Sequence, residues 1–100
     1  MIHQALFWLK NPNDPAARDT LVAGLRTLGT IDIVQSLRIG IPATTESRDV
    51  VDASFDVMET MEFASLADQA AYQNHPAHCR FIEECAHLWA KVVVYDTETI

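Results

Sequence analysis

The sequence predicts an α+β fold of the ferredoxin-like type, with the element order βαββαβ and an antiparallel sheet. Four short segments are apolar or alternate between apolar and polar residues, as strands do. Longer stretches between them repeat apolar residues at helical spacing, and Pro, Gly, Asn and Asp mark the connections. The chain has 100 residues, 49% of them hydrophobic, so we expect a single domain over residues 1–100.

The first strand and the first helix are predicted in the N-terminal third of the chain. A strand over residues 2–10 has apolar residues on both faces, which is typical of a strand that is covered on two sides. Asp14 can cap the following helix, with Pro15 at the first helical position and Gly29 at the end. The apolar residues at helical spacing in this segment are Leu21, Val22, Leu25 and Leu28.

Two strands are predicted in the middle of the chain, separated by a polar connection. The first covers residues 33–41, in which alternate residues are apolar. Residues 42–49 are polar and rich in turn-forming types. The second strand is predicted over residues 50–61, with Phe55 and Val57 on one face.

The last part of the chain predicts an interrupted helix and a closing strand. Ser65 can cap a helix over residues 66–72. Pro76 has no amide hydrogen and disfavours helical geometry at the residue before it, so the helix breaks there. A second helical piece over residues 76–88 and a strand over residues 91–95 complete the order.

The predicted first and last strands are apolar on both faces. The helices of a βαββαβ unit cover only one face of the sheet, so something else must cover the other. The economical solution is a second copy of the same sheet, related by a twofold axis. We therefore expect a homodimer in which two sheets form a dimeric α/β barrel.

The charge balance excludes some classes of partner. Lys and Arg number 7 against 14 Asp and Glu, for a net charge of -7. An acidic surface repels phosphate backbones and anionic membranes, so neither nucleic acid nor a membrane is an expected partner. The sequence has no apolar run long enough to span a bilayer and no N-terminal pattern of a signal peptide, which predicts a cytoplasmic protein.

Three ring side chains that can handle protons lie within seven residues, at Tyr72, His75 and His78. His78 is the best candidate for a general acid or base, because imidazole titrates near neutral pH. Tyr72 can stabilise an oxyanion or orient His78. Structural explanations remain open: a hydrogen-bonded helix histidine for His78, a tyrosine at the edge of the core for Tyr72, and a helix cap for His75.

His3 is a further candidate in the opening strand. It alternates with Phe7 and other apolar residues, so we expect its ring to point into the barrel or its mouth, although a hydrogen-bonded core histidine explains it as well. The predicted ligand-binding residues are His3, Phe7, Tyr72, His75 and His78. Of these, His3, Tyr72 and His78 are the candidate catalytic residues.

The sequence does not indicate a metal or an organic cofactor. His75 and His78 have an i, i+3 spacing, but no carboxylate motif completes a ligand set for zinc. Phosphate-binding loops and dinucleotide fingerprints are absent. We therefore expect neither a metal nor a cofactor.

The stretch Tyr72-Gln73-Asn74-His75-Pro76-Ala77-His78, with the opening strand and the closing Lys91-Val92-Val93-Val94-Tyr95-Asp96, resembles the stress-responsive A/B barrel (Dabb) family. The resemblance covers essentially the whole chain. It implies a homodimeric α/β barrel with a role in a stress response, in a family most of whose members have no established biochemical activity. The apolar barrel face with few polar groups predicts a small-molecule pocket in the barrel.

One branch of that family, olivetolic acid cyclase, is distantly similar and implies an enzymatic alternative. It closes a linear polyketide by an aldol condensation without a cofactor, and its active residues correspond to His3, Tyr72 and His78. This chain departs from it at Val57, where that branch has a histidine. The sequence thus leaves three hypotheses: a ligand-binding dimer, a cofactor-independent proton-transfer enzyme acting on a carbonyl compound, and a structural dimer with a filled barrel.

Overall fold

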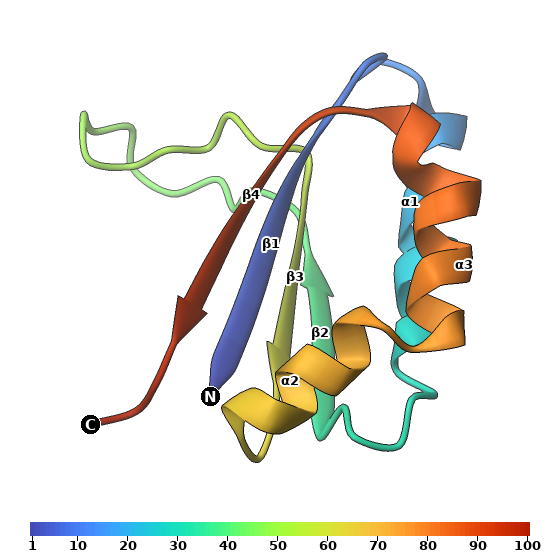
Figure 1. The fold of residues 1–100 in the computed structure, drawn as a ribbon. Coiled ribbons are helices and arrows are strands. Elements are labelled where there is room, and N and C mark those ends of the chain that lie inside the picture. The colour runs from blue at the N-terminus through green and yellow to red at the C-terminus, as the bar shows by residue number, and fades with distance from the viewer.

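A computed structural model describes residues 1–100 of the chain as one sheet with helices packed on one of its faces (Figure 1). The order of strands and helices matches the predicted βαββαβ pattern. The elements are β1 (Ile2–Leu9), α1 (Pro15–Leu28), β2 (Ser36–Gly40), β3 (Val57–Glu62), α2 (Leu66–Gln73), α3 (Pro76–Cys85), the short 3-10 helix η1 (Ala86–Leu88) and β4 (Trp89–Thr97).

The sheet has the strand order β2-β3-β1-β4, and every neighbouring pair is antiparallel. The first strand therefore lies in the interior of the sheet, between β3 and β4. This is the ferredoxin-like α+β fold that the sequence predicts, and the prediction is confirmed. A residue on β1 therefore has a neighbouring strand on each side, and both neighbouring strands contribute side chains to the surroundings of His3.

The hydrophobic core lies between the sheet and the helices. On β1 every second side chain is buried, from His3 to Leu9, and these side chains face the helices. Leu21, Leu25 and Leu28 of α1 are completely buried against them. Burying one such leucine stabilises the fold by roughly 1.5–3 kcal/mol, so the amphipathic pattern of α1 accounts for its position.

The two middle strands are shorter than predicted. The strand expected over residues 33–41 begins only at Ser36, because Ile31 to Val34 form a turn in which the Val34 amide donates to the Ile31 carbonyl at 3.0 Å. The strand expected over residues 50–61 is confined to Val57–Glu62. Apolar alternation predicted both extensions, but a strand also needs a neighbour to pair with.

Residues 41–56 instead leave the sheet as a long, mostly exposed excursion (Figure 1). Asp56 ties its end to β1, since its carboxylate accepts the Leu9 amide at 2.8 Å and its own amide donates to the Phe7 carbonyl at 2.8 Å. The Trp8 indole donates to the Ser54 hydroxyl at 3.1 Å. These contacts fix the point at which β3 begins.

The interrupted helix is confirmed, with adjusted ends. The Ser65 hydroxyl caps α2 by accepting the Asp68 amide at 3.1 Å, and α3 begins at Pro76. The helix expected to reach residue 88 ends at Cys85, and η1 follows it. The last strand is longer than the predicted 91–95, because β4 pairs along the whole length of β1.

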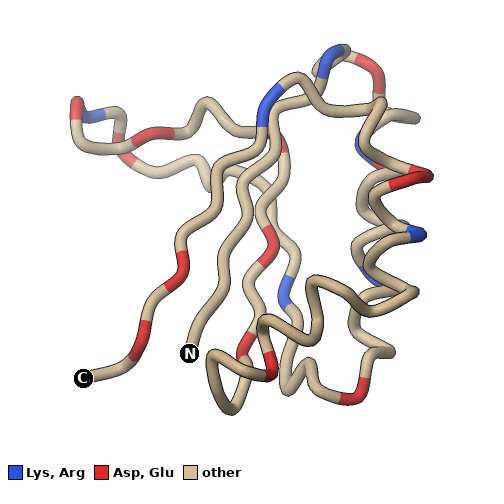
Figure 2. The backbone as a smooth tube through the Cα atoms, viewed as in Figure 1, with Lys and Arg blue, Asp and Glu red and all other residues tan.

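The excess of acidic residues is spread along the chain and is not gathered on one element (Figure 2). The structure contains no helix with the length and apolarity needed to cross a membrane.

Candidate functional site

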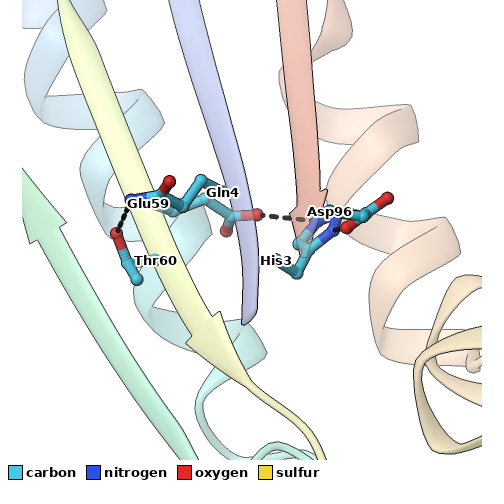
Figure 3. Close-up of polar contacts among 5 residues, drawn as sticks. All are labelled: His3, Gln4, Glu59, Thr60 and Asp96. Carbon is cyan, nitrogen blue, oxygen red and sulfur yellow. Dashed lines mark hydrogen bonds and ion pairs between the residues drawn. The ribbon is translucent and has the colours of Figure 1, made fainter. Parts of the chain in front are cut away.

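The ring of His3 lies between two carboxylates that come from the strands on either side of β1 (Figure 3). Its Nδ1 is 2.5 Å from Asp96 Oδ1, and its Nε2 is 3.5 Å from Glu59 Oε1. His3 is only 4% exposed, and burial by itself would lower its pKa. The hydrogen bonds and charges of Glu59 and Asp96 outweigh the burial, so the pKa of His3 is raised above its ordinary value.

Neither carboxylate was among the residues predicted from the sequence. Asp96 stands directly opposite His3 in the β1–β4 pairing, and Glu59 lies opposite Ala5 on β3, two residues along from Met61, which is the partner of His3. One signal could have revealed Glu59, because this charged residue shares the parity of the apolar Val57 and Met61. A charge at an inward-facing position is unusual unless it has a partner or a task.

Glu59 is 3% exposed, and its second oxygen, Oε2, has no hydrogen-bond partner. The other oxygen faces His3. Leaving a buried polar atom unpaired is costly, and for a charged group the cost is higher still. Such an atom calls for an explanation beyond folding.

Tyr72 reaches the same place from α2. Its side chain is 1% exposed, and the centroid of its ring lies 4.7 Å from that of His78 and 6.0 Å from that of His3. Burial raises the pKa of Tyr72 well above its ordinary value, and the charge of Glu59 adds to the effect. The phenol is therefore protonated at neutral pH and can donate a hydrogen bond.

His78 lies in the first turn of α3, directly beyond the break at Pro76. It is partly buried, and this burial lowers its pKa despite opposing contributions from the Gln73 backbone and the Glu59 charge. A neutral imidazole can accept a proton from a ligand. The site thus places a neutral histidine beside a neutral tyrosine, with the carboxylate-bound His3 also near the tyrosine ring.

A cavity of about 170 Å³ lies at the meeting point of these side chains. Polar groups at its wall come from His3, Glu59, Gln73 and His78 and from the hydroxyl of Tyr72, and the other lining residues are hydrophobic. The apolar part of the wall includes Phe7, Phe81, Ile82, Trp89 and Val92.

The cavity is lined by residues of β1, β3, β4, α2 and α3, so it lies on the helix-covered face of the sheet. The alternation of apolar residues in the opening strand predicted that His3 points into the barrel or its mouth, and a second sheet would form that barrel on the opposite face. That expectation is wrong: His3 shares the parity of Ala5 and Phe7, and this is the parity that packs against the helices.

His75 does not join the other predicted site residues. Its Nδ1 accepts the Ala77 amide at 3.0 Å and caps α3, and its side chain borders a separate depression beside Ile31 and Ala71. The structure therefore supports the helix-cap explanation for His75 and not the ligand contact. The predicted residues His3, Phe7, Tyr72 and His78 do come together around the cavity.

The structure contains no group of three or more His, Cys, Asp or Glu side chains with an arrangement that could hold a metal ion. The chemistry available from the assembled side chains is proton transfer and hydrogen bonding. His78 can accept a proton, Tyr72 can donate a hydrogen bond, and Glu59 can accept one.

Comparison with known proteins gives a family match over nearly the whole chain. Residues 1–99 match the family model described as Stress responsive A/B Barrel Domain, or Dabb. A search among curated proteins finds no match.

Solved structures share the fold at low sequence identity. A Dabb family protein with a ferredoxin-like fold from Mesorhizobium loti is 22% identical, with a TM-score of 0.78, covering 99% of this chain and 95% of that one. A dimeric ferredoxin-like protein from Thermobifida fusca is 20% identical, with a TM-score of 0.73 and coverage of 94% and 85%. A hydroxynitrile lyase from Passiflora edulis is 20% identical, with a TM-score of 0.74 and coverage of 99% and 94%.

Proposed function

The chain belongs to the stress responsive A/B barrel domain family, and from this premise we propose that it is a homodimer that binds a small apolar or aromatic molecule in the cavity of each protomer. The observation that carries the proposal is the convergence of five polar side chains from four different elements on one largely apolar cavity. Ligand sites have this composition, with apolar walls and a few placed polar groups. A role in a stress response, a cytoplasmic location, the absence of a cofactor and the absence of nucleic-acid partners stay predictions.

The open face of the sheet supports the homodimer. The side chains of Ile2, Leu6 and Trp8 on β1 point away from the helices, and Met58 and Val93 lie on either side of Leu6. A related structure of the same fold is described as dimeric. Covering this apolar face at about 25 cal/mol per Å² favours association of two copies.

The alternative is a cofactor-independent enzyme that transfers protons on a carbonyl compound. In this reaction His78 removes a proton from the carbon next to a carbonyl, and the electron pair of the broken C–H bond forms an enolate. The Tyr72 hydroxyl donates a hydrogen bond to the enolate oxygen, and His3 orients the carbonyl or a neighbouring hydroxyl. The observation in its favour is the opposite direction of the pKa shifts of His78 and His3 across one cavity.

Two comparisons bear on this alternative. A structure of the same fold is a hydroxynitrile lyase, which shows that the fold can support an enzyme of that name. The third-strand histidine of olivetolic acid cyclase is replaced here by Val57, which is completely buried in the core and offers no polar group. We therefore propose proton transfer in general and not the cyclisation of a polyketide.

Deuterium exchange separates the two proposals. Wild-type protein is incubated in D₂O with a one-ring methyl ketone, such as acetophenone, while NMR follows binding and the loss of the α-proton signal. An enzyme binds the ketone and accelerates the exchange, and His78→Gln slows it by at least about 100-fold because a general base contributes that much. Tyr72→Phe slows it as well, since the enolate loses its donor.

The variants also test whether these residues are only structural. Both substitutions keep the size of the side chain, so we expect the free energy of unfolding to change by less than about 1.5 kcal/mol. Binding of the ketone without exchange supports the ligand-binding dimer. Absence of binding across a panel of one-ring ligands contradicts both proposals, and so does easy unfolding of both variants.

A further inference from the structure

Glu59 Oε2 is the one buried side-chain nitrogen or oxygen in the chain that has no hydrogen-bond partner. Glu59 is also among the residues that line the cavity. Its other oxygen lies 3.5 Å from His3, which holds the carboxylate in place and leaves Oε2 free. An acceptor in this position gains most from a ligand that brings a hydrogen-bond donor to it.

The size of the cavity limits the ligand. A cavity of 170 Å³ is slightly larger than an apolar cavity of about 150 Å³ that holds one benzene molecule. The apolar walls, which include Phe7, Phe81 and Trp89, suit a ring. The space therefore fits a single six-membered ring with one small substituent.

The charges around the cavity limit the substituent. Two carboxylates, Glu59 and Asp96, face the single ring of His3, and the whole chain carries a net charge of -7. A carboxylate on the ligand would bring a third negative charge to this group. An ammonium group would lie close to His3, whose charged form the same two carboxylates favour, so repulsion between like charges disfavours it.

We infer that Glu59 determines the specificity of the cavity and that its Oε2 accepts a hydrogen bond from the hydroxyl group of a neutral one-ring ligand. The inference rests on the proposed ligand-binding function and adds the chemical class of the ligand to it. Tyr72 and His78 then face the substituted end of the ring, and the apolar wall holds the rest.

The test compares phenol with toluene, which has nearly the same shape and no donor. Titrations followed by NMR or calorimetry give the affinity of each for the wild type, for Glu59→Val and for the control Glu62→Val, an exposed carboxylate on the same strand. The wild type and Glu62→Val should bind phenol at least about tenfold more tightly than toluene, because a hydrogen bond to a charged group strengthens binding by at least that factor. In Glu59→Val toluene should bind at least as tightly as phenol.

A second variant is needed because Glu59→Val could destabilise the fold. Glu59→Gln keeps the shape and an acceptor but removes the charge, so it should bind phenol less tightly than the wild type and still prefer it to toluene. Equal affinity of the wild type for phenol and toluene overturns the role of Glu59, as does an unchanged preference in Glu59→Val. Tighter binding of benzoate than of phenol also overturns it.

The two levels of the proposal fail in different ways. If none of the probes binds the wild type, the ligand-binding function and the role of Glu59 fall together. If the probes bind without a preference that depends on Glu59, the cavity remains a ligand site and only the assigned specificity falls.

Discussion

Two histidines at one cavity, the buried His3 and the partly buried His78, have opposite changes in pKa. The pKa of His3 is raised because Glu59 and Asp96 favour its charged form, whereas the pKa of His78 is lowered because burial dominates there. Burial alone would lower both. The carboxylates that raise the pKa of His3 come from the neighbouring strands. The direction of the shift is therefore set by the surroundings of the histidine and not by its residue type.

The raised pKa of His3 predicts a pH-dependent contribution to stability. Its folded pKa lies above the ordinary value of 6.5, so the stabilisation is fully present below that value and is lost as pH rises through the folded pKa. The difference in free energy of unfolding between wild type and His3→Gln should therefore be larger at about pH 5.5 than at about pH 8.5.

Urea unfolding at several pH values measures this difference. His78 is present in both proteins, and only the part of its pKa shift that comes from the charge of His3 differs between them. A difference that grows as the pH rises would mean that the two carboxylates do not stabilise the charged form of His3.

At the scale of the elements, the helix α3 carries both a site residue and a wall of the cavity. It provides His78 in its first turn and Phe81 one turn later, and it packs against α1. The packing is close at Gly24 of α1, where an added Cβ would lie 2.6 Å from Cys85 Sγ and 3.1 Å from Phe81 Cδ1. The position of the cavity wall thus depends on a small residue outside the site.

Gly24→Ala should destabilise the protein although alanine favours a helix by about 1 kcal/mol. The clash with Cys85 costs about 1–3 kcal/mol in a close-packed interface. In a Cys85→Ala background the sulfur is gone, so Gly24→Ala should cost at least about 0.5 kcal/mol less than in the wild type. Thermal or urea unfolding of the four proteins gives this coupling, and equal costs in both backgrounds would show that Cys85 does not limit the packing.

In the whole molecule, the two faces of the sheet carry different features. The helix-covered face holds the core and the cavity, and the open face holds the apolar side chains that the proposed dimer buries. Each protomer therefore has its own complete cavity within one chain. Ligand binding and dimerisation therefore use different faces of the sheet, and each can be tested without disturbing the other.

Leu6→Asp should convert the proposed dimer to a monomer. Leu6 lies on the open face between Met58 and Val93, and a charge buried there would have no partner. Light scattering should report about twice the chain mass for the wild type and for Ala23→Asp, an exposed position on α1, and the single mass for Leu6→Asp. A wild-type protein that is monomeric and well folded at micromolar concentration would contradict the proposed homodimer.

The sequence alone determined the features that depend on near neighbours along the chain. The Asp14 and Ser65 caps, the break at Pro76 and the order of strands and helices were all predicted, because capping and amphipathic patterns act within a few residues. The family resemblance at Tyr72–His78 was likewise local in the sequence, and the family is confirmed.

Only the tertiary structure decided what surrounds His3. Asp96 is 93 positions away along the chain, and Glu59 reaches the same ring from a third strand. Their meeting depends on the order and register of the strands, which local patterns do not specify. The same holds for the start of β3 at Val57 and for the side of the sheet that holds the cavity, since both are decided by which partners the strands and helices find in space.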